Sequence, residues 1–397
     1  MTSTRNGPPP RRPPGPSAPT RPQRRTRTIH PGVVVVFAFA LFVLLLVLHH
    51  FHHAAPPKRA VAVTTTTRPV QLTVASATCT FVDPSRTTKD YVTETTTPGR
   101  RLITDIYYPA IESDGKHSAA SVPARRLGPF PTILFAGGYG IDPSSYAALL
   151  DRWVADGFVV IAPRFPDASV AAVAALNGGD ADEADIPNEP GDLTFVTRRA
   201  IAISAGTAAG CPVLRGLVSA NALGLAGQSD GATVVAMLGF DHGDLPGTTT
   251  TYASLRTGIN YRAVAVLSGA AYGADPYAGG AGSPALLSVN SATDTCNTPT
   301  QAVDLYSAIV QADRWFLAIT SADHLTPYEG QDAAAFEVVA QVTAAYFTDE
   351  LGGVTPGASF LAIGNREPSV AALVHGTDLP SDLNVDNGDG GVDCYAT

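Results

Sequence analysis

The sequence predicts an α/β fold with a mostly parallel central sheet and helices on both of its faces. Short, almost entirely apolar runs recur along the chain, and amphipathic helix-like runs separate them. Continuous apolar strands are typical of parallel sheets, because the crossover helices bury both faces. A third observation, a Gly-x-Ser-x-Gly turn between one such strand and one such helix, indicates a candidate catalytic serine.

The expected strands are short and rich in apolar and β-branched residues. In chain order they are residues 102–108, 131–135, 158–162, 222–226, 263–267, 285–289 and 315–319. The expected helices repeat apolar residues at helical spacing. The first begins near Ser144 and ends near Gly157. The others span 193–203, 232–238, a segment that begins near Thr298, and 333–347. Residues after about Gly357 show no clear pattern, so we expect a C-terminal extension there.

The N-terminal region predicts a membrane anchor. Residues 1–31 combine seven arginines with many prolines and no acid, so we expect a disordered basic tail. Residues 32–51 contain the unbroken apolar run 33–48, which makes the segment about long enough to span a bilayer. The arginines precede it, so the positive-inside bias keeps the N-terminus cytoplasmic and puts the domain that follows outside the cell.

Secretion after cleavage of a signal peptide is the alternative, but no small-residue cleavage site follows the apolar run closely. Residues 52–73 are interpreted as a linker, and residues 74–397 as one α/β domain that includes the extension from about 357. Removing the tail's seven arginines from the 26 basic residues leaves 19 against 35 acids, a net charge of about −16. Such a domain is a poor partner for nucleic acid, which needs clustered Lys and Arg.

Four cysteines follow the predicted anchor: Cys79, Cys211, Cys296 and Cys394. An even number in an oxidising compartment indicates two disulfides, for which three pairings exist. We favour Cys79 with Cys211 and Cys296 with Cys394. The wide spacing excludes a zinc ribbon.

The turn Gly227-Gln228-Ser229-Asp230-Gly231 has the layout of a nucleophile elbow, in which a strained strand-to-helix turn exposes a serine hydroxyl. Backbone and helix approach closely at such a turn, so Gly227 and Gly231 are what sterics require. A serine needs a histidine to take its proton and a carboxylate to orient that histidine.

Asp294 follows the expected strand 285–289, and His324 follows 315–319. Side chains at the carboxyl ends of such strands meet at one edge of the sheet. We therefore predict Ser229, Asp294 and His324 as catalytic residues. The rivals are His375 for the base and Asp304 for the acid, and Asp294 could instead cap the helix that begins near Thr298.

A tetrahedral intermediate needs two hydrogen-bond donors for its oxyanion. We predict the backbone N–H groups of Asp230, after the nucleophile, and of Tyr139, in the glycine-rich turn after strand 131–135. The Tyr139 ring would also form an apolar wall for substrate. The acidic segment 180–192 lacks the alternation and internal glycine of a calcium loop, so we interpret it as a solvated insertion and predict no metal.

With these residues, the chain resembles serine α/β-hydrolases of the dienelactone hydrolase and platelet-activating-factor acetylhydrolase type, close to cutinase-like polyester hydrolases. The resemblance covers about residues 80–352. Besides the elbow, Asp294 and His324, it rests on residues 81–86, 106–110, 138–139, 157–162 and 192–196.

The resemblance implies an esterase or lipase with no cofactor. The chain departs from the family pattern in three places: Gly137 stands where a histidine is usual, Gln228 replaces the elbow histidine, and Tyr272 is a loose substitute for the aromatic clamp tryptophan. We therefore expect Tyr139, Gln228 and Tyr272 at the substrate.

The sequence thus predicts a membrane-anchored serine hydrolase that cleaves a small-molecule or lipid-like carboxylic ester through an acyl-serine intermediate. Two alternatives stay open. One is an acyltransferase acting on cell-envelope sugars or lipids, and the other is a non-catalytic binding domain on a hydrolase scaffold.

Overall fold

The computed structural model describes residues 72–112, 121–176, 183–245, 248–273, 277–279, 282–310, 312–352, 358–377 and 379. The described residues belong to one compact unit, Arg68–Thr397. The predicted tail, the predicted anchor and Cys394 lie outside them, as does His117. Within the described segments, no helix has both the length and the apolar character needed to cross a bilayer.

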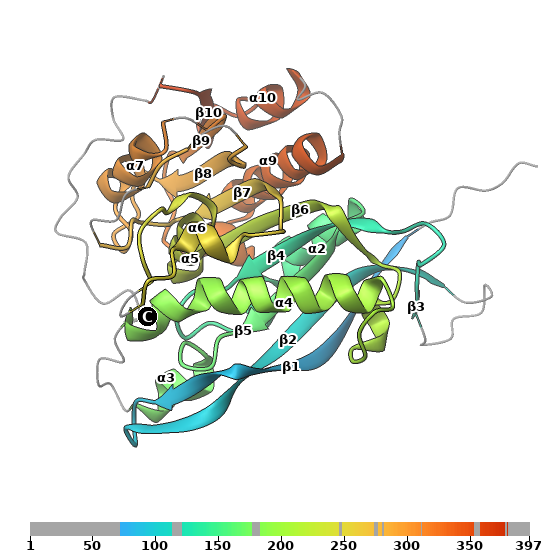
Figure 1. The fold of residues 1–397 in the computed structure, drawn as a ribbon. Helices are drawn as coiled ribbons and strands as arrows, with labels where there is room; N and C mark the ends of the chain where they lie inside the picture. The colour runs from blue at the N-terminus through green and yellow to red at the C-terminus, as the bar shows by residue number, and fades with distance from the viewer. Residues whose placement is uncertain are drawn as a thin grey trace, which may run out of the picture. The chain divides into compact units, whose positions relative to one another are not determined.

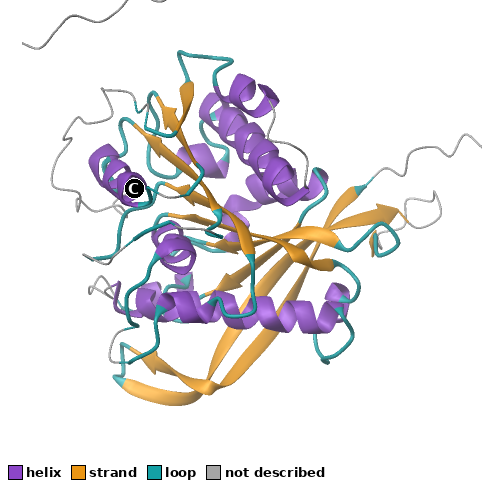
Figure 2. Ribbon diagram, turned by 45° about the horizontal axis from the view of Figure 1, so that its top comes forward, coloured by secondary structure: helices purple, strands orange, loops and turns teal. Residues whose placement is uncertain are grey.

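The strands of the described segments form one mixed sheet in the order β1-β2-β5-β4-β6-β7-β8-β9-β10, and β3 pairs with β2. The strands are β1 (Thr73–Asp90), β2 (Thr95–Glu112), β3 (Ser121–Pro123), β4 (Phe130–Ala136), β5 (Val159–Arg164), β6 (Val218–Gln228), β7 (Tyr261–Leu267), β8 (Ala285–Ser291), β9 (Arg314–Ile319) and β10 (Ala371–His375). Strands β5, β4, β6, β7, β8 and β9 run parallel to their neighbours in that series. Figure 2 shows the strands as one continuous twisted surface with helices on either side.

The helices that cover the sheet are α2 (Ala147–Ala155), α4 (Glu189–Ser204), α5 (Asp230–Phe240), α7 (Pro299–Ala308), α9 (Ala333–Gly352) and α10 (Ala358–Gly364). Helices α4, α5 and α7 pack with one apolar cluster, and α2, α9 and α10 pack with a second cluster. Figure 1 shows these two groups on opposite faces of the sheet. The inner strands are buried almost throughout, as expected where helices cover both faces.

Shorter helical segments complete the described chain. They are the 3₁₀ turns η1 (Pro143–Tyr146), η2 (Glu183–Asn188) and η3 (Pro212–Leu214), and the short helices α3 (Val170–Ala175), α6 (Tyr252–Leu255) and α8 (Thr326–Glu329). The 3₁₀ turn η1 leads directly into α2, so the helix expected near Ser144 begins with a tighter turn.

The sheet departs from the expected parallel pattern at both ends. Strands β1 and β2 form a long antiparallel hairpin, and β2 also pairs antiparallel with β5. At the other end, β10 pairs antiparallel with β9. We expected a C-terminal extension after about residue 357. Part of that region instead forms helix α10 and the sheet strand β10. The whole is a mixed α/β architecture with a large central sheet, compatible with an α/β-hydrolase fold.

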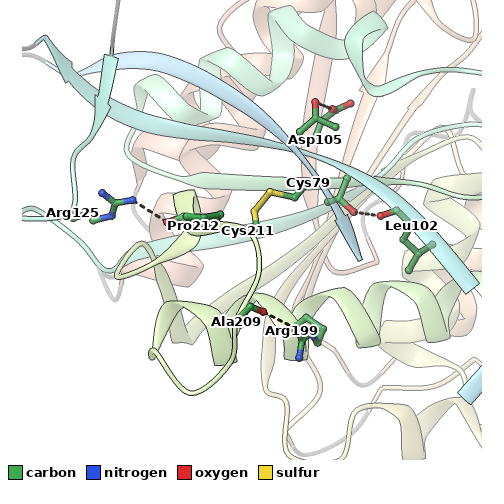
Figure 3. The surroundings of a disulfide bond; sticks show 10 residues. Cys79, Leu102, Asp105, Arg125, Arg199, Ala209, Cys211 and Pro212 are labelled. Carbon is green, nitrogen blue, oxygen red and sulfur yellow. Dashed lines mark hydrogen bonds between the residues drawn. A yellow bond between two sulfur atoms is a disulfide. The ribbon is translucent and has the colours of Figure 1, made fainter. Parts of the chain in front are cut away.

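The predicted disulfide between Cys79 and Cys211 is confirmed. It joins β1 to the turn before η3, and its two cysteines are separated by 132 positions. Figure 3 shows this bridge with two arginines bonded to main chain nearby: Arg125 donates to the carbonyl of Pro212 at 3.0 Å, and Arg199 donates to that of Ala209 at 2.9 Å. Cys296 also takes part in a disulfide, and its predicted partner Cys394 lies outside the described residues.

Candidate active site

Ser229 occupies the strained turn between β6 and α5. Its backbone has φ 57° and ψ −125°, a conformation that non-glycine residues rarely adopt. Its N–H donates to the carbonyl of Leu267 at the end of β7 (3.0 Å), and its own carbonyl accepts from the N–H groups of Ala232 and Thr233 (2.9 and 3.1 Å). The neighbouring strand and the first turn of α5 thus hold the serine in place.

The glycines of the turn are required by close backbone contacts, as the sequence predicts. A Cβ atom on Gly227 would lie 2.1 Å from the carbonyl oxygen of Gly231. A Cβ atom on Gly231 would lie 2.2 Å from the carbonyl oxygen of Ala136, at the end of β4. Both distances are far inside van der Waals contact, so a side chain at either position would force the strand and helix apart.

The three predicted catalytic side chains come together at the carboxyl ends of β6, β8 and β9. His324 Nε2 lies 2.8 Å from Ser229 Oγ. On the other side of the ring, Nδ1 lies 2.9 and 3.1 Å from Oδ2 and Oδ1 of Asp294. The three contacts fit a neutral imidazole that donates from Nδ1 to the carboxylate and accepts the serine hydroxyl at Nε2.

Asp294 is held in a fixed orientation. Its side chain is fully buried, and Oδ1 accepts the backbone N–H groups of Cys296 (2.9 Å) and Asn297 (3.1 Å). The adjoining α7 has its own cap, because the Thr298 hydroxyl and the Gln301 side chain form a capping box. Asp294 is therefore free of the capping role that the sequence left open.

The loops that carry Asp294 and His324 are tied together. The backbone N–H of Ala322 donates to Ser291 Oγ at 2.8 Å, and Thr293 Oγ1 donates to the carbonyl of Ala322 at 3.1 Å. These bonds join the residues just before Asp294 to those just before His324. These bonds therefore fix the position of the Asp294 carboxylate relative to the His324 imidazole.

The rival residues lie elsewhere. His375 stands at the end of β10, where its Nε2 lies 2.6 Å from Asp313 Oδ1 and its side chain is 53% exposed. Asp304 lies on an exposed position of α7. His242 is exposed just after α5. Among the described histidines, only His324 has a ring in contact with Ser229.

Both predicted oxyanion donors belong to backbone beside Ser229. Asp230 is the first residue of α5. The turn that contains Tyr139 follows β4 and passes close to the serine, because a Cβ atom on Gly138 would lie 3.1 Å from Ser229 Cβ. The N–H of Gly140 anchors this turn through the carbonyl of Ala168, at 2.9 Å. Tyr139 itself is half-buried.

Of the predicted substrate contacts, Gln228 requires a correction. Its side chain is fully buried, with its oxygen on the hydroxyl of Tyr146 and its nitrogen on His324. An amide enclosed in this way does not face a substrate. Tyr272 lies in the segment after β7, half-buried, and its backbone N–H donates to the Tyr277 hydroxyl at 3.0 Å. Its role at the substrate stays a prediction.

The acids of segment 180–192 whose side chains the structure describes are not solvated, contrary to the expectation, and Asp180 and Asp182 lie outside the described residues. Asp185, Glu189 and Asp192 are at most 5% exposed, and Arg100, itself 2% exposed, lies among them. Arg100 Nε lies 2.7 Å from Asp192 Oδ1, and Nη2 lies 2.5 Å from Asp185 Oδ2. The described residues contain no group of three or more acidic, His or Cys side chains arranged to hold a metal ion.

Burial changes the protonation of this acidic cluster. It raises the pKa of Glu189 well above the ordinary value, and the neighbouring carboxylates add to the effect. It raises the pKa of Asp167 to about 7, with a contribution from Asp185 that exceeds the opposing effect of Arg100. Burial also raises the pKa of Asp192, although its bonds to Arg100 and Arg86 oppose this effect. The cluster is an ion-pair network in which burial makes the carboxyl groups of Glu189, Asp167 and Asp192 harder to ionise.

A cavity of about 560 Å³ lies between the tip of the β1–β2 hairpin and α3. Its lining comes from residues 88–97 and 166–176, and none of the three predicted catalytic residues contributes. It therefore does not define the space that a substrate would occupy at Ser229.

Comparisons with known proteins bear on the fold alone. No protein-family model matches the chain, and a search of curated proteins finds no match. Among solved structures, the chain is similar to a ferulic acid esterase from Streptomyces cinnamoneus, with a TM-score of 0.55 and 17% sequence identity. The match covers 81% of this chain and 98% of that one.

Proposed function

We propose that this chain is a serine hydrolase that cleaves carboxylic esters through an acyl-serine intermediate. The single observation that carries the proposal is the unbroken contact series from Ser229 through His324 to Asp294, with distances of 2.8 and 2.9 Å. A hydroxyl bonded to an imidazole that is oriented by a buried carboxylate is the arrangement that activates serine as a nucleophile.

In the proposed reaction, Ser229 Oγ attacks the acyl carbon while its proton passes to His324 Nε2. The carbonyl oxygen becomes an oxyanion and accepts hydrogen bonds from the backbone N–H groups of Tyr139 and Asp230. His324 then gives the proton to the leaving alcohol as the bond from the acyl carbon to the alcohol oxygen breaks. Water then attacks the acyl carbon while His324 takes its proton, and His324 returns that proton to Ser229 Oγ as the acyl–Oγ bond breaks and the acid leaves. Asp294 keeps the imidazole oriented throughout.

The similar solved structure supports an ester as the substrate to try, because that protein is a ferulic acid esterase. The low identity limits this support to the choice of test compounds. Methyl ferulate therefore belongs beside short p-nitrophenyl esters in the assay.

We also propose that the domain works outside the cytoplasm, held by the anchor predicted at residues 32–51. The disulfide between Cys79 and Cys211 supports this location, since such bonds persist in oxidising compartments. Membrane fractionation of the full chain, with and without residues 1–51, tests the anchor. Full chain that stays in the soluble fraction would overturn it.

The test of the activity is ester hydrolysis by wild type, Ser229→Ala, His324→Ala and His375→Ala. The first two substitutions should lower kcat by about 10⁴-fold or more, and the matched His375→Ala control should stay within about twofold of wild type. Free acid should be the product. Full turnover by Ser229→Ala would refute the proposal.

A further inference from the structure

We propose that Gln228 is a positioning residue that links His324, through Tyr146, to the turn that contains the predicted oxyanion donor Tyr139. The inference rests on the hydrolase function proposed above and deepens it. Gln228 is the last residue of β6, directly before Ser229, and its side chain is fully buried.

The oxygen end of the Gln228 amide is set by a tyrosine. Tyr146 is fully buried on η1, and its hydroxyl accepts the backbone N–H of Gly138 at 3.2 Å. The same hydroxyl donates its proton to Gln228 Oε1 at 2.7 Å. Burial raises the pKa of Tyr146 well above the ordinary value, so the hydroxyl keeps the proton that it donates.

The nitrogen end of the amide faces His324. Gln228 Nε2 donates to the main-chain carbonyl of His324 at 3.2 Å and lies 3.3 Å from His324 Nε2. The opposite orientation would set Oε1 against that carbonyl, with two acceptors facing each other. The contacts with Tyr146 and with His324 therefore favour the same orientation of the amide.

One hydrogen-bond chain thus runs from Gly138, beside the predicted donor Tyr139, through Tyr146 and Gln228 to His324. The fit is tight, because a Cβ atom on Gly138 would lie 2.8 Å from Gln228 Oε1. Catalysis by a base and an oxyanion hole depends on their relative placement, and a displacement of about 1 Å can cost about 100-fold in rate. Gln228 holds the two parts at a fixed separation.

The charged groups around the imidazole are carboxylates. Asp294 contacts the ring directly, Asp230 and Glu329 contribute to the raised pKa of the adjoining Tyr146 hydroxyl, and the exposed Asp323 precedes His324. The side chain of Gln228 faces His324 Nε2 at 3.3 Å and is neutral, so a carboxylate at position 228 would add a negative charge beside the ring.

Four variants test the proposal: Gln228→Glu, Gln228→Ala, Tyr146→Phe, and the control Thr343→Val. The control removes a buried bond of similar kind, from Trp153 Nε1 to Thr343 Oγ1 at 2.9 Å, in α9. Steady-state kinetics on p-nitrophenyl acetate from pH 4 to 9 gives kcat, KM and the acidic limb of kcat/KM, and thermal unfolding gives Tm.

We expect kcat to fall by about 10- to 100-fold in Gln228→Ala and Tyr146→Phe, with KM changed less than about threefold. In the isosteric Gln228→Glu, a carboxylate replaces the amide, so the acidic limb should move up by about one pH unit or more. Thr343→Val should lower Tm alone. If Gln228→Ala does not fold, Gln228→Glu and Tyr146→Phe carry the test.

Wild-type kcat in Tyr146→Phe, or an unmoved acidic limb in Gln228→Glu, would overturn the proposal. The proposal would also be overturned if kcat fell in these variants no more than it falls in Thr343→Val at an equal loss of Tm. Failure of the hydrolase function itself is separate, because it would appear as turnover that survives Ser229→Ala.

Discussion

The imidazole Nε2 of His324 lies 2.8 Å from the hydroxyl oxygen of Ser229, although 95 positions separate the two residues in the chain. The strands that lead to them, β6 and β9, are separated in the sheet by β7 and β8, and all four run parallel. Their carboxyl ends therefore open onto one edge of the sheet, where loops from distant parts of the chain meet.

Asp294→Asn should lower kcat by about 10⁴-fold with little change in fold, because the amide would favour the wrong tautomer of His324. Steady-state hydrolysis of a p-nitrophenyl ester measures the loss. Asp304→Asn, on the exposed side of α7, is the matched control and should keep wild-type kcat. Equal losses in both variants would remove Asp294 from the mechanism.

Gly231→Ala should destabilise the protein severely, by more than about 4 kcal/mol, because its Cβ would lie 2.2 Å from the Ala136 carbonyl oxygen. Gly258→Ala is the control. Unlike Gly231, that glycine has a positive φ, of 78°, but a Cβ there meets nothing within 4 Å, so the substitution should cost only about 1–2 kcal/mol. Urea unfolding measures both, and similar values would mean that the elbow relaxes around a methyl group.

Replacing Cys79 and Cys211 together with serine should lower the free energy of unfolding by about 2–5 kcal/mol, because the bridge closes a long loop in the unfolded chain. Thermal unfolding with and without a reductant measures it. The double variant should show a smaller response to reductant than wild type. A Tm unchanged by the double substitution would show that β1 is held without the bridge.

Two conservative changes in the acidic cluster should have opposite signs. Asp192→Asn removes the fully buried carboxylate that Arg100 Nε and Nη2 contact at 2.7 Å and should cost about 3–5 kcal/mol. Glu189→Gln removes a carboxyl whose pKa burial has raised, and should stabilise the protein at pH 8. Chemical unfolding of both variants measures the pair, and a destabilising Glu189→Gln would contradict the prediction.

The pH dependence of the unfolding free energy follows from the raised pKa values of Glu189 and Asp167. A carboxyl whose pKa is raised in the folded state binds a proton there that the unfolded chain releases, so its contribution to stability is lost as pH rises. For Asp167 this loss falls between about pH 4 and pH 7. Glu189→Gln should flatten the decline in unfolding free energy measured from pH 4 to 8.

The central strands, the elbow and the contacts of Ser229, Asp294 and His324 were accessible to sequence reasoning. Buried parallel strands read as apolar runs, and an elbow needs glycines where backbones touch, so local patterns carried enough information. The sequence could favour the pairing of Cys79 with Cys211 but could not establish it, since four cysteines allow three pairings.

Other features depend on partners that are distant in sequence. Strand β10 has five residues at the sheet edge, and β1 has mostly exposed or half-buried side chains, so neither shows an apolar run. The burial of Asp185, Glu189 and Asp192 is not evident from the sequence, because their counter-ion, Arg100, lies 85 positions before Asp185. Gln228 looked like a substrate contact because its bond to Tyr146 spans 82 positions. The signal that could have found it is a polar residue inside an otherwise apolar strand end.

The most direct test of the account is covalent labelling with a fluorophosphonate, followed by peptide mass spectrometry of the intact, folded protein. We predict a single adduct on Ser229 in wild type, none in Ser229→Ala, and labelling slowed by about 100-fold or more in His324→Ala, since the serine then lacks its base. Folded wild-type protein that stays unlabelled, or that carries the adduct on another residue, would contradict the account.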